Sequence, residues 1–144
     1  MNPLEPAWRK HKSIPSSSRH AVDLIRELLD QLELSQWTNR QIFGIHLAME
    51  EALMNAIKHG NLNDESKTVC VEIELTKEQF QAKITDEGEG FCLEDVPDPT
   101  EDVNLELPSG RGVAMIKNFV DQAIYNPTGN SVTLMARRKT KPAD

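Results

Sequence analysis

The stretch from Glu51 to Gly60, EALMNAIKHG, constrains the fold of this chain more than any other part of its sequence. From Asn39 to Lys58 there is no proline and Gly44 is the one glycine, so the region can form a single helix. Apolar residues recur there at helical spacing and predict one buried face, made of Ile45, Ala48, Met49, Ala52 and Ala56.

A second, polar row accompanies that face, because Glu51, Asn55 and His59 are four residues apart. A carboxylate can accept a proton, and a neutral amide oxygen is a ligand suited to Mg²⁺. One interpretation is therefore a site that holds a metal and a water together. The other is an ordinary solvated stripe, which most surface helices carry. In either case Gly60 predicts the end of the helix through a left-handed conformation.

Composition narrows the class of protein. The 144 residues suit one domain, 1–144, and the net charge of −7 argues against binding to a nucleic-acid backbone. No apolar run is long enough to span a membrane, and the first residues lack the apolar core of a secretory signal. Cys70 and Cys92 have no metal-binding spacing. We expect a reduced, cytoplasmic protein, although a disulfide between the two cysteines stays open.

Periodicity along the rest of the chain predicts an α+β fold. A helix is expected over residues 18–34, with a serine of the Ser16–Ser18 run as its N-cap. Alternating apolar and polar residues predict strands at 68–75 and 79–85. Further strands are expected at 8–14, 122–126 and 131–137. A loop is expected over 92–109 and a short helix over 113–120. Short turns between strands favour a mixed or mostly antiparallel sheet with helices on one face.

Two glycine motifs complete the set of candidate functional segments. Asp86 follows a strand on its core-facing side, where a carboxylate needs a partner because unpaired burial is costly. It opens D-E-G-E-G-F, whose glycines let the backbone approach a ligand closely. Further on, G-R-G precedes the expected short helix, whose free amides can bind an anion. Each motif alone is weak, and their fixed order is much more specific.

In that order, E-A-L-M-N-A-I-K-H-G, D-E-G-E-G-F and G-R-G-V-A-M-I resemble the three boxes of the GHKL ATP-binding superfamily, which includes gyrase and the histidine kinases. The closer likeness is to the small anti-sigma-factor serine/threonine protein kinases, with further matches in S-I-P-S and the final G-N-S-V-T-L. The resemblance covers residues 14–138 and implies a two-layer α/β sandwich of the Bergerat type. A P-loop is excluded, because no G-x-x-x-x-G-K-[ST] is present.

The resemblance also implies roles for individual residues. Asn55 would bind a Mg²⁺ that bridges the ATP phosphates, Glu51 would activate the attacking hydroxyl or water, and Asp86 would accept a hydrogen bond from the adenine amino group. The remaining ATP contacts would come from Gly88 and Gly90 near adenine and ribose, from Gly110, Arg111 and Gly112 at the phosphates, and from Ser131 or Asn130 at the adenine. Residues 92–109 would form a lid over ATP.

The function implied is that of an ATP-dependent serine/threonine protein kinase acting as an anti-sigma factor. It would bind a sigma factor and phosphorylate a small antagonist protein, using ATP and Mg²⁺, without contacting nucleic acid or membrane. A homodimer through the N-terminal strand or the first helix fits the same resemblance. Two alternatives stay open: an ATP-binding interaction module without phosphotransfer, and a detached histidine-kinase catalytic domain. Against the latter, His20 is the one candidate phospho-acceptor, and its surroundings do not resemble such a motif.

Overall fold

The computed structural model describes residues 8–88, 119–127 and 129–139. In chain order the elements are β1 (Trp8–Pro15), α1 (Ser18–Leu34), α2 (Asn39–Asn55), the π-helical turn η1 (Ala56–Gly60), β2 (Thr68–Leu75), β3 (Gln79–Thr85), β4 (Gln122–Tyr125) and β5 (Ser131–Arg137). The predicted α+β fold is confirmed. Several predicted features lie outside the described residues, namely the lid at 92–109, the helix at 113–120 except its last two residues, and Gly90, Gly110, Arg111 and Gly112.

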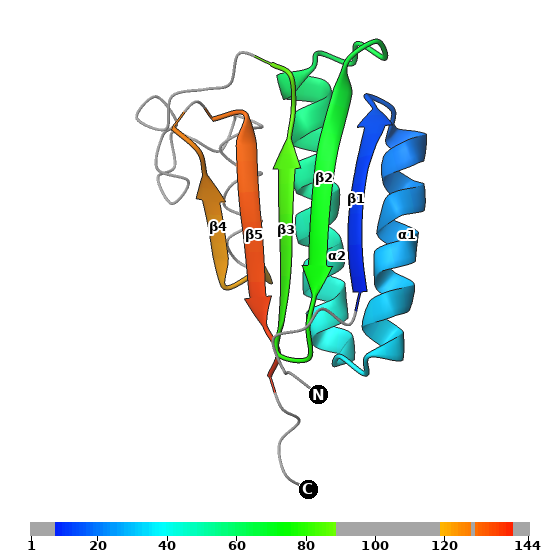
Figure 1. Cartoon of the computed structure of the whole chain (residues 1–144), viewed down its shortest axis with the longest axis vertical. Coiled ribbons are helices and arrows are strands. Elements are labelled where there is room, and N and C mark those ends of the chain that lie inside the picture. Colours follow the sequence, from blue (N-terminus) through cyan, green and yellow to red (C-terminus); the bar gives the residue numbers. More distant parts are fainter. Residues whose placement is uncertain (1–7, 89–118, 128, 140–144) are drawn as a thin grey trace, which may run out of the picture.

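The five described strands form one sheet in the order β1-β2-β3-β5-β4, and all four pairings are antiparallel. Figure 1 shows α2 running behind β2 and β3, while α1 packs against α2 and β1. The sheet and the helices therefore form the two layers that the sequence predicted. None of the helices in the described ranges is long and apolar enough to cross a membrane.

Strict alternation along the strands explains why one face of the sheet is covered. Val69, Val71, Ile73 and Leu75 of β2 are buried, whereas Glu72 between them is exposed. The inward residues of β3 and β5 continue this core, which the apolar faces of the two helices complete. Because each strand has one apolar face, the opposite face of the sheet stays polar.

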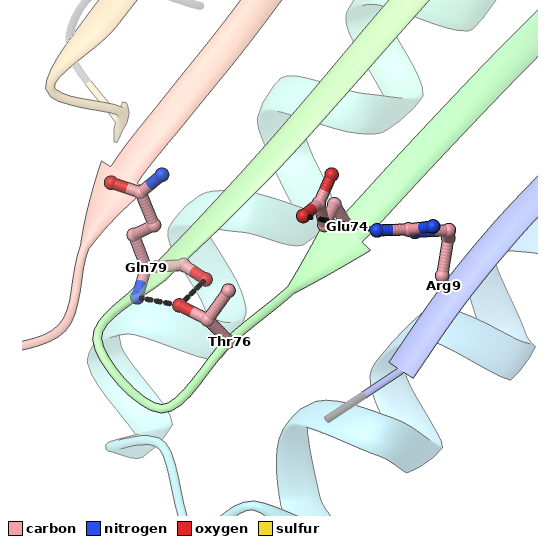
Figure 2. A network of polar contacts seen from close by, with 4 residues as sticks. All are labelled: Arg9, Glu74, Thr76 and Gln79. Atoms are coloured by element: carbon pink, nitrogen blue, oxygen red, sulfur yellow. Dashed lines mark hydrogen bonds and ion pairs between the residues drawn. The ribbon is translucent and has the colours of Figure 1, made fainter. Parts of the chain in front are cut away.

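The β2–β3 connection shows how one buried polar side chain sets a tight turn. The Thr76 hydroxyl accepts hydrogen bonds from the backbone N–H groups of Glu78 at 3.2 Å and Gln79 at 3.0 Å. Nearby on the exposed face of the sheet, Arg9 of β1 and Glu74 of β2 form an ion pair at 3.6 Å (Figure 2). This turn lies at the end of the sheet away from the end of α2 (Figure 1).

The two helices begin differently. Thr38 caps α2 by accepting a hydrogen bond from the Gln41 N–H at 3.2 Å. For α1 a serine, Ser17, occupies the N-cap position as expected, but its hydroxyl makes no side-chain cap hydrogen bond, so that part of the prediction was wrong. The Ser16 hydroxyl, which is buried, donates instead to the Lys67 carbonyl at 2.8 Å. Ser16 therefore ties the start of α1 to the segment that leads into β2.

The end of the central helix also differs from the prediction. The α-helical hydrogen bonds end at Asn55, and Ala56–Gly60 forms a π-helical turn closed by a 2.8 Å hydrogen bond from the Asn61 N–H to the Ala56 carbonyl. Gly60 does not take a left-handed conformation, since Gly129 is the one described glycine with a positive φ, at 78°. The reason for glycine at position 60 is a close contact with Asp86, described below.

Candidate functional site

Five elements converge at one end of the sheet, where α2 and η1 end, β3 and β4 end, and β5 begins (Figure 1). Thr85 at the end of β3 lies opposite Ser131 at the start of β5. Asp86 comes next, and its N–H donates to the Asn130 carbonyl at 2.9 Å. The antiparallel pairing thus brings the D-E-G-E-G-F motif and the G-N-S-V-T-L motif to the same place.

The Asp86 carboxylate packs directly against the backbone of Gly60. A Cβ atom added at Gly60 would lie 2.3 Å from both Cγ and Oδ2 of Asp86, which is far inside van der Waals contact. At Gly88, an added Cβ would lie 2.1 Å from the Gly60 carbonyl oxygen. Both positions therefore need glycine for close approach, and the Asp86–Gly88 turn and the end of the central helix interlock.

The Asp86 carboxyl has the partner that the sequence analysis required. Its Oδ1 accepts a hydrogen bond from the Gly88 N–H at 2.7 Å. Partial burial raises the pKa of this carboxyl above its ordinary value, and the Gly88 hydrogen bond acts in the opposite direction. Among the hydrogen bonds of the described residues none uses Oδ2, so this oxygen keeps its capacity to accept from a ligand.

Glu51 and Asn55 lie on the last turns of α2, and both are half-buried. The Asn55 side chain forms no capping hydrogen bond at the start of η1, so its amide oxygen is available to a ligand. Tyr125 of β4 lies close enough to Glu51 that the two interact electrostatically. Burial first, and then the negative charge of Glu51, raise the pKa of Tyr125 to about 12.

The histidines considered in the sequence are not buried at this site. Asn55 is the last residue of α2, and His59 lies within the π-helical turn η1 that follows it. His59 is exposed. The His46 side chain is 39% exposed, and its Nε2 lies 3.4 Å from Glu50 Oε2.

The two candidates for the last adenine contact differ in their surroundings. Ser131 is buried, and its hydroxyl accepts a hydrogen bond from Thr85 Oγ1 at 3.2 Å. Asn130 is half-buried and uses its side chain within the turn, where Oδ1 accepts from Asn126 at 2.7 Å. Both remain beside Asp86, so the geometry brings the two candidates together with the carboxylate.

Sequence reasoning missed two residues at this end of the fold. Asn61 is completely buried and hydrogen-bonds to the backbone N–H of Glu87 at 2.8 Å. It begins a polar stretch, residues 61–67, that reads as an ordinary loop. Tyr125 is the one tyrosine of the chain. Its place in the alternation of β4 could have predicted that it faces the protein interior. Its proximity to Glu51 could not be predicted, because the two residues meet only in the folded chain.

Comparison with known proteins identifies the family. A model of the histidine kinase-like ATPase domain matches residues 14–136. The chain belongs to this family. An anti-sigma F factor of Clostridium perfringens is 30% identical over 105 residues, covering 71% of this chain and 75% of the relative. An anti-sigma F factor of Clostridium botulinum is 32% identical over 103 residues, covering 69% of this chain and 71% of the relative.

A solved structure shares the fold. The crystal structure of the RsbU and RsbW domains of Rv1364c from Mycobacterium tuberculosis matches with a TM-score of 0.65 at 19% identity. The match covers 96% of this chain and 34% of that chain. The family match confirms the predicted membership of the GHKL superfamily, and the shared fold confirms the predicted Bergerat-type architecture. Membership of an ATPase domain family makes ATP the nucleotide of the site, while the roles of single residues stay predictions.

Proposed function

We propose that this chain is an ATP-dependent serine/threonine protein kinase that acts as an anti-sigma factor. Its protein partners would be a sigma factor and a small antagonist protein, which it phosphorylates. The names of the relatives, anti-sigma F factors, support this class of partner. A second copy is a further proposed partner, through β1, which is an edge strand of the described sheet.

One observation carries the proposal: Gly60 and the Asp86 carboxylate are in contact. Gly60 ends the turn that directly continues the helix of Glu51 and Asn55. The contact therefore places the Asp86 carboxylate, which suits an adenine amino group, beside the helix that carries Glu51 and Asn55. These two side chains suit the phosphate end of the same nucleotide. A solvated helical stripe would not need a glycine packed on a half-buried acid.

The residues present fit Mg²⁺ and ATP by their chemistry. Mg²⁺ keeps several waters and needs few protein ligands, so the half-buried Asn55 amide oxygen suffices to hold it. When bound, the metal would supply charge neutralisation for the transferred phosphoryl group. Asp86 Oδ2 would accept a hydrogen bond from the adenine amino group, with the Gly88 N–H holding Oδ1. The remaining nucleotide contacts are proposed as the resemblance implies. Adenine and ribose would be contacted by Gly88 and Gly90, the phosphates by Gly110, Arg111 and Gly112, and the adenine also by Ser131.

Glu51 would act as the general base of the transfer. The serine or threonine hydroxyl of the antagonist attacks the γ-phosphorus, the bond to the bridging oxygen of ADP breaks, and the hydroxyl proton passes to the Glu51 carboxylate. Tyr125, whose pKa of about 12 keeps it neutral, lies beside this carboxylate without adding charge to it. Phosphoryl transfer asks the protein mainly for position and charge neutralisation, which this arrangement can supply.

The test is to incubate the protein with labelled ATP, Mg²⁺ and a candidate antagonist protein, and to identify the modified residue. Phosphoserine or phosphothreonine on the antagonist is the expected result. Label on a histidine would support a histidine-kinase catalytic domain instead. ATP and sigma-factor binding without any transfer would leave an interaction module.

A further inference from the structure

Asn61 is a buried polar residue whose side chain hydrogen-bonds to three different segments. None of its surface is exposed. Its Nδ2 donates to Ser16 Oγ at 2.9 Å and to the Thr68 carbonyl at 3.0 Å. Its Oδ1 accepts from the Glu87 N–H at 2.8 Å. A buried amide satisfied in this way fixes the segments that it joins, because breaking any one bond leaves a buried polar group unpaired.

The backbone of Asn61 is held as firmly as its side chain. Its N–H closes the π-helical turn on the Ala56 carbonyl at 2.8 Å, so its position is set relative to α2. On the other side, the Ser16 hydroxyl that accepts from Asn61 donates to the Lys67 carbonyl at 2.8 Å. Asn61 is thus a rigid link between the end of the central helix and the turn that carries Asp86.

This link acts on Asp86 through the peptide group that follows it. The N–H of Asp86 is bonded to Asn130 at 2.9 Å, and the next N–H, that of Glu87, is bonded to Asn61. The peptide groups on both sides of the Asp86 Cα are therefore fixed, the first by the sheet side and the second by Asn61. Fixing both restricts the backbone dihedrals of Asp86, and with them the direction of its carboxylate.

We infer that Asn61 is a positioning residue that aims the Asp86 carboxylate at the amino group of adenine. The inference rests on the proposed function, in which Asp86 reads that amino group. It adds a specificity determinant outside the glycine motifs and one residue beyond the helix box. Loss of the Asn61 hydrogen bond should weaken recognition of the adenine amino group more than binding of the rest of the nucleotide.

The experiment compares two ligands, ATP and purine riboside triphosphate, which lacks the 6-amino group. Wild-type protein should bind ATP more tightly by roughly tenfold or more, the scale of a hydrogen bond to a charged group. Asn61→Ala should lower ATP affinity towards that of the purine analogue, whose own affinity changes little. The change should be absent in an Asp86→Asn background, because Asn61 acts through Asp86.

Thr76→Ala is the matched control. Thr76 is also a buried side chain that holds backbone N–H groups of a turn, but at the far end of β3 (Figure 2). The Thr76→Ala protein should be less stable than wild type and should keep the wild-type preference for ATP over purine riboside triphosphate. If Asn61→Ala also keeps that preference, Asn61 does not position Asp86. The inference then fails, while the proposed role of Asp86 in reading adenine stands.

Equal affinity of wild-type protein for the two ligands would reject the role of Asp86, and the inference with it. If Asn61→Ala does not fold, Asn61→Ser is measured in its place with the same expectation. Should both variants be unfolded, Asn61 is a folding residue, and the positioning role is rejected.

Discussion

Replacing Gly60 by alanine should damage nucleotide binding more than it damages the fold. The added Cβ would lie 2.3 Å from Asp86 Cγ, whereas ordinary carbon contacts are about 3.5–4.0 Å, so the carboxylate must move by about 1.2–1.7 Å. The atoms struck are the end of a side chain, which can rotate away. Overpacking of this kind costs about 1–3 kcal/mol. Part of that cost is offset, because the φ of Gly60 is not positive and alanine restricts the unfolded chain.

The same movement should remove the hydrogen bond that Asp86 offers to adenine. A hydrogen bond to a charged group is worth about 1.5–3 kcal/mol, which corresponds to a loss of roughly 10- to 150-fold in ATP affinity. Calorimetric titration with ATP measures the affinity, and urea unfolding measures the stability. Because Gly60→Ala acts on Asp86, adding it to Asp86→Asn should lower affinity little further.

Gly88→Ala provides the comparison, because its Cβ would lie 2.1 Å from the Gly60 carbonyl oxygen and 2.7 Å from the carbonyl carbon. These are backbone atoms that cannot rotate away, so this variant should lose more stability than Gly60→Ala. A folded Gly60→Ala protein with wild-type ATP affinity would refute the reasoning. Either the Asp86 carboxylate would not have moved, or ATP binding would not depend on it.

Two further predictions concern titration. Because burial raises the pKa of Asp86, the stability it contributes is complete below about pH 3.8 and falls as the pH rises through its folded value. Asp86→Asn should therefore gain stability relative to wild type as the pH rises from acid to neutral, and a constant difference in urea unfolding across that range would contradict this. Tyr125 is the one tyrosine of the chain, so the change of absorbance on tyrosine ionisation reports this residue alone. Its side chain should stay mostly neutral near pH 11, where an ordinary tyrosine is mostly ionised. Glu51→Gln should lower this pKa, and an unchanged titration would place Glu51 away from Tyr125.

The parts of the fold that depend on local pattern could be predicted from the sequence. The alternation of Val69, Val71, Ile73 and Leu75 specified β2 and its buried face, since side chains of a strand alternate between the two faces. The apolar row of the central helix did the same for α2. The parity of β3 also indicated that Asp86 needs a partner, which proved to be the Gly88 N–H.

The features that were missed are set by contacts between distant segments. The π-helical turn at Ala56–Gly60 was not indicated by the local sequence, and its last residue, Gly60, packs on Asp86, which lies in a later segment of the chain. Ser16 looked like a helix cap, yet its hydroxyl serves the carbonyl of Lys67, which is 51 residues away. Asn61 looked like a loop residue for the same reason, since its partners Ser16, Thr68 and Glu87 meet it only in the folded chain.

The central claim is that Glu51 is the base and Asn55 the metal ligand of one phosphotransfer site. The direct measurement compares Mg-ATP affinity and the rate of phosphate transfer to the antagonist in Glu51→Gln, Asn55→Ala and Glu50→Gln. Glu50 is the neighbouring exposed glutamate on the same helix, so its variant should match wild type in both quantities. Glu51→Gln should bind Mg-ATP nearly normally and transfer about 10²–10⁴-fold more slowly, whereas Asn55→Ala should lose both. Transfer by Glu51→Gln at the wild-type rate would contradict the account.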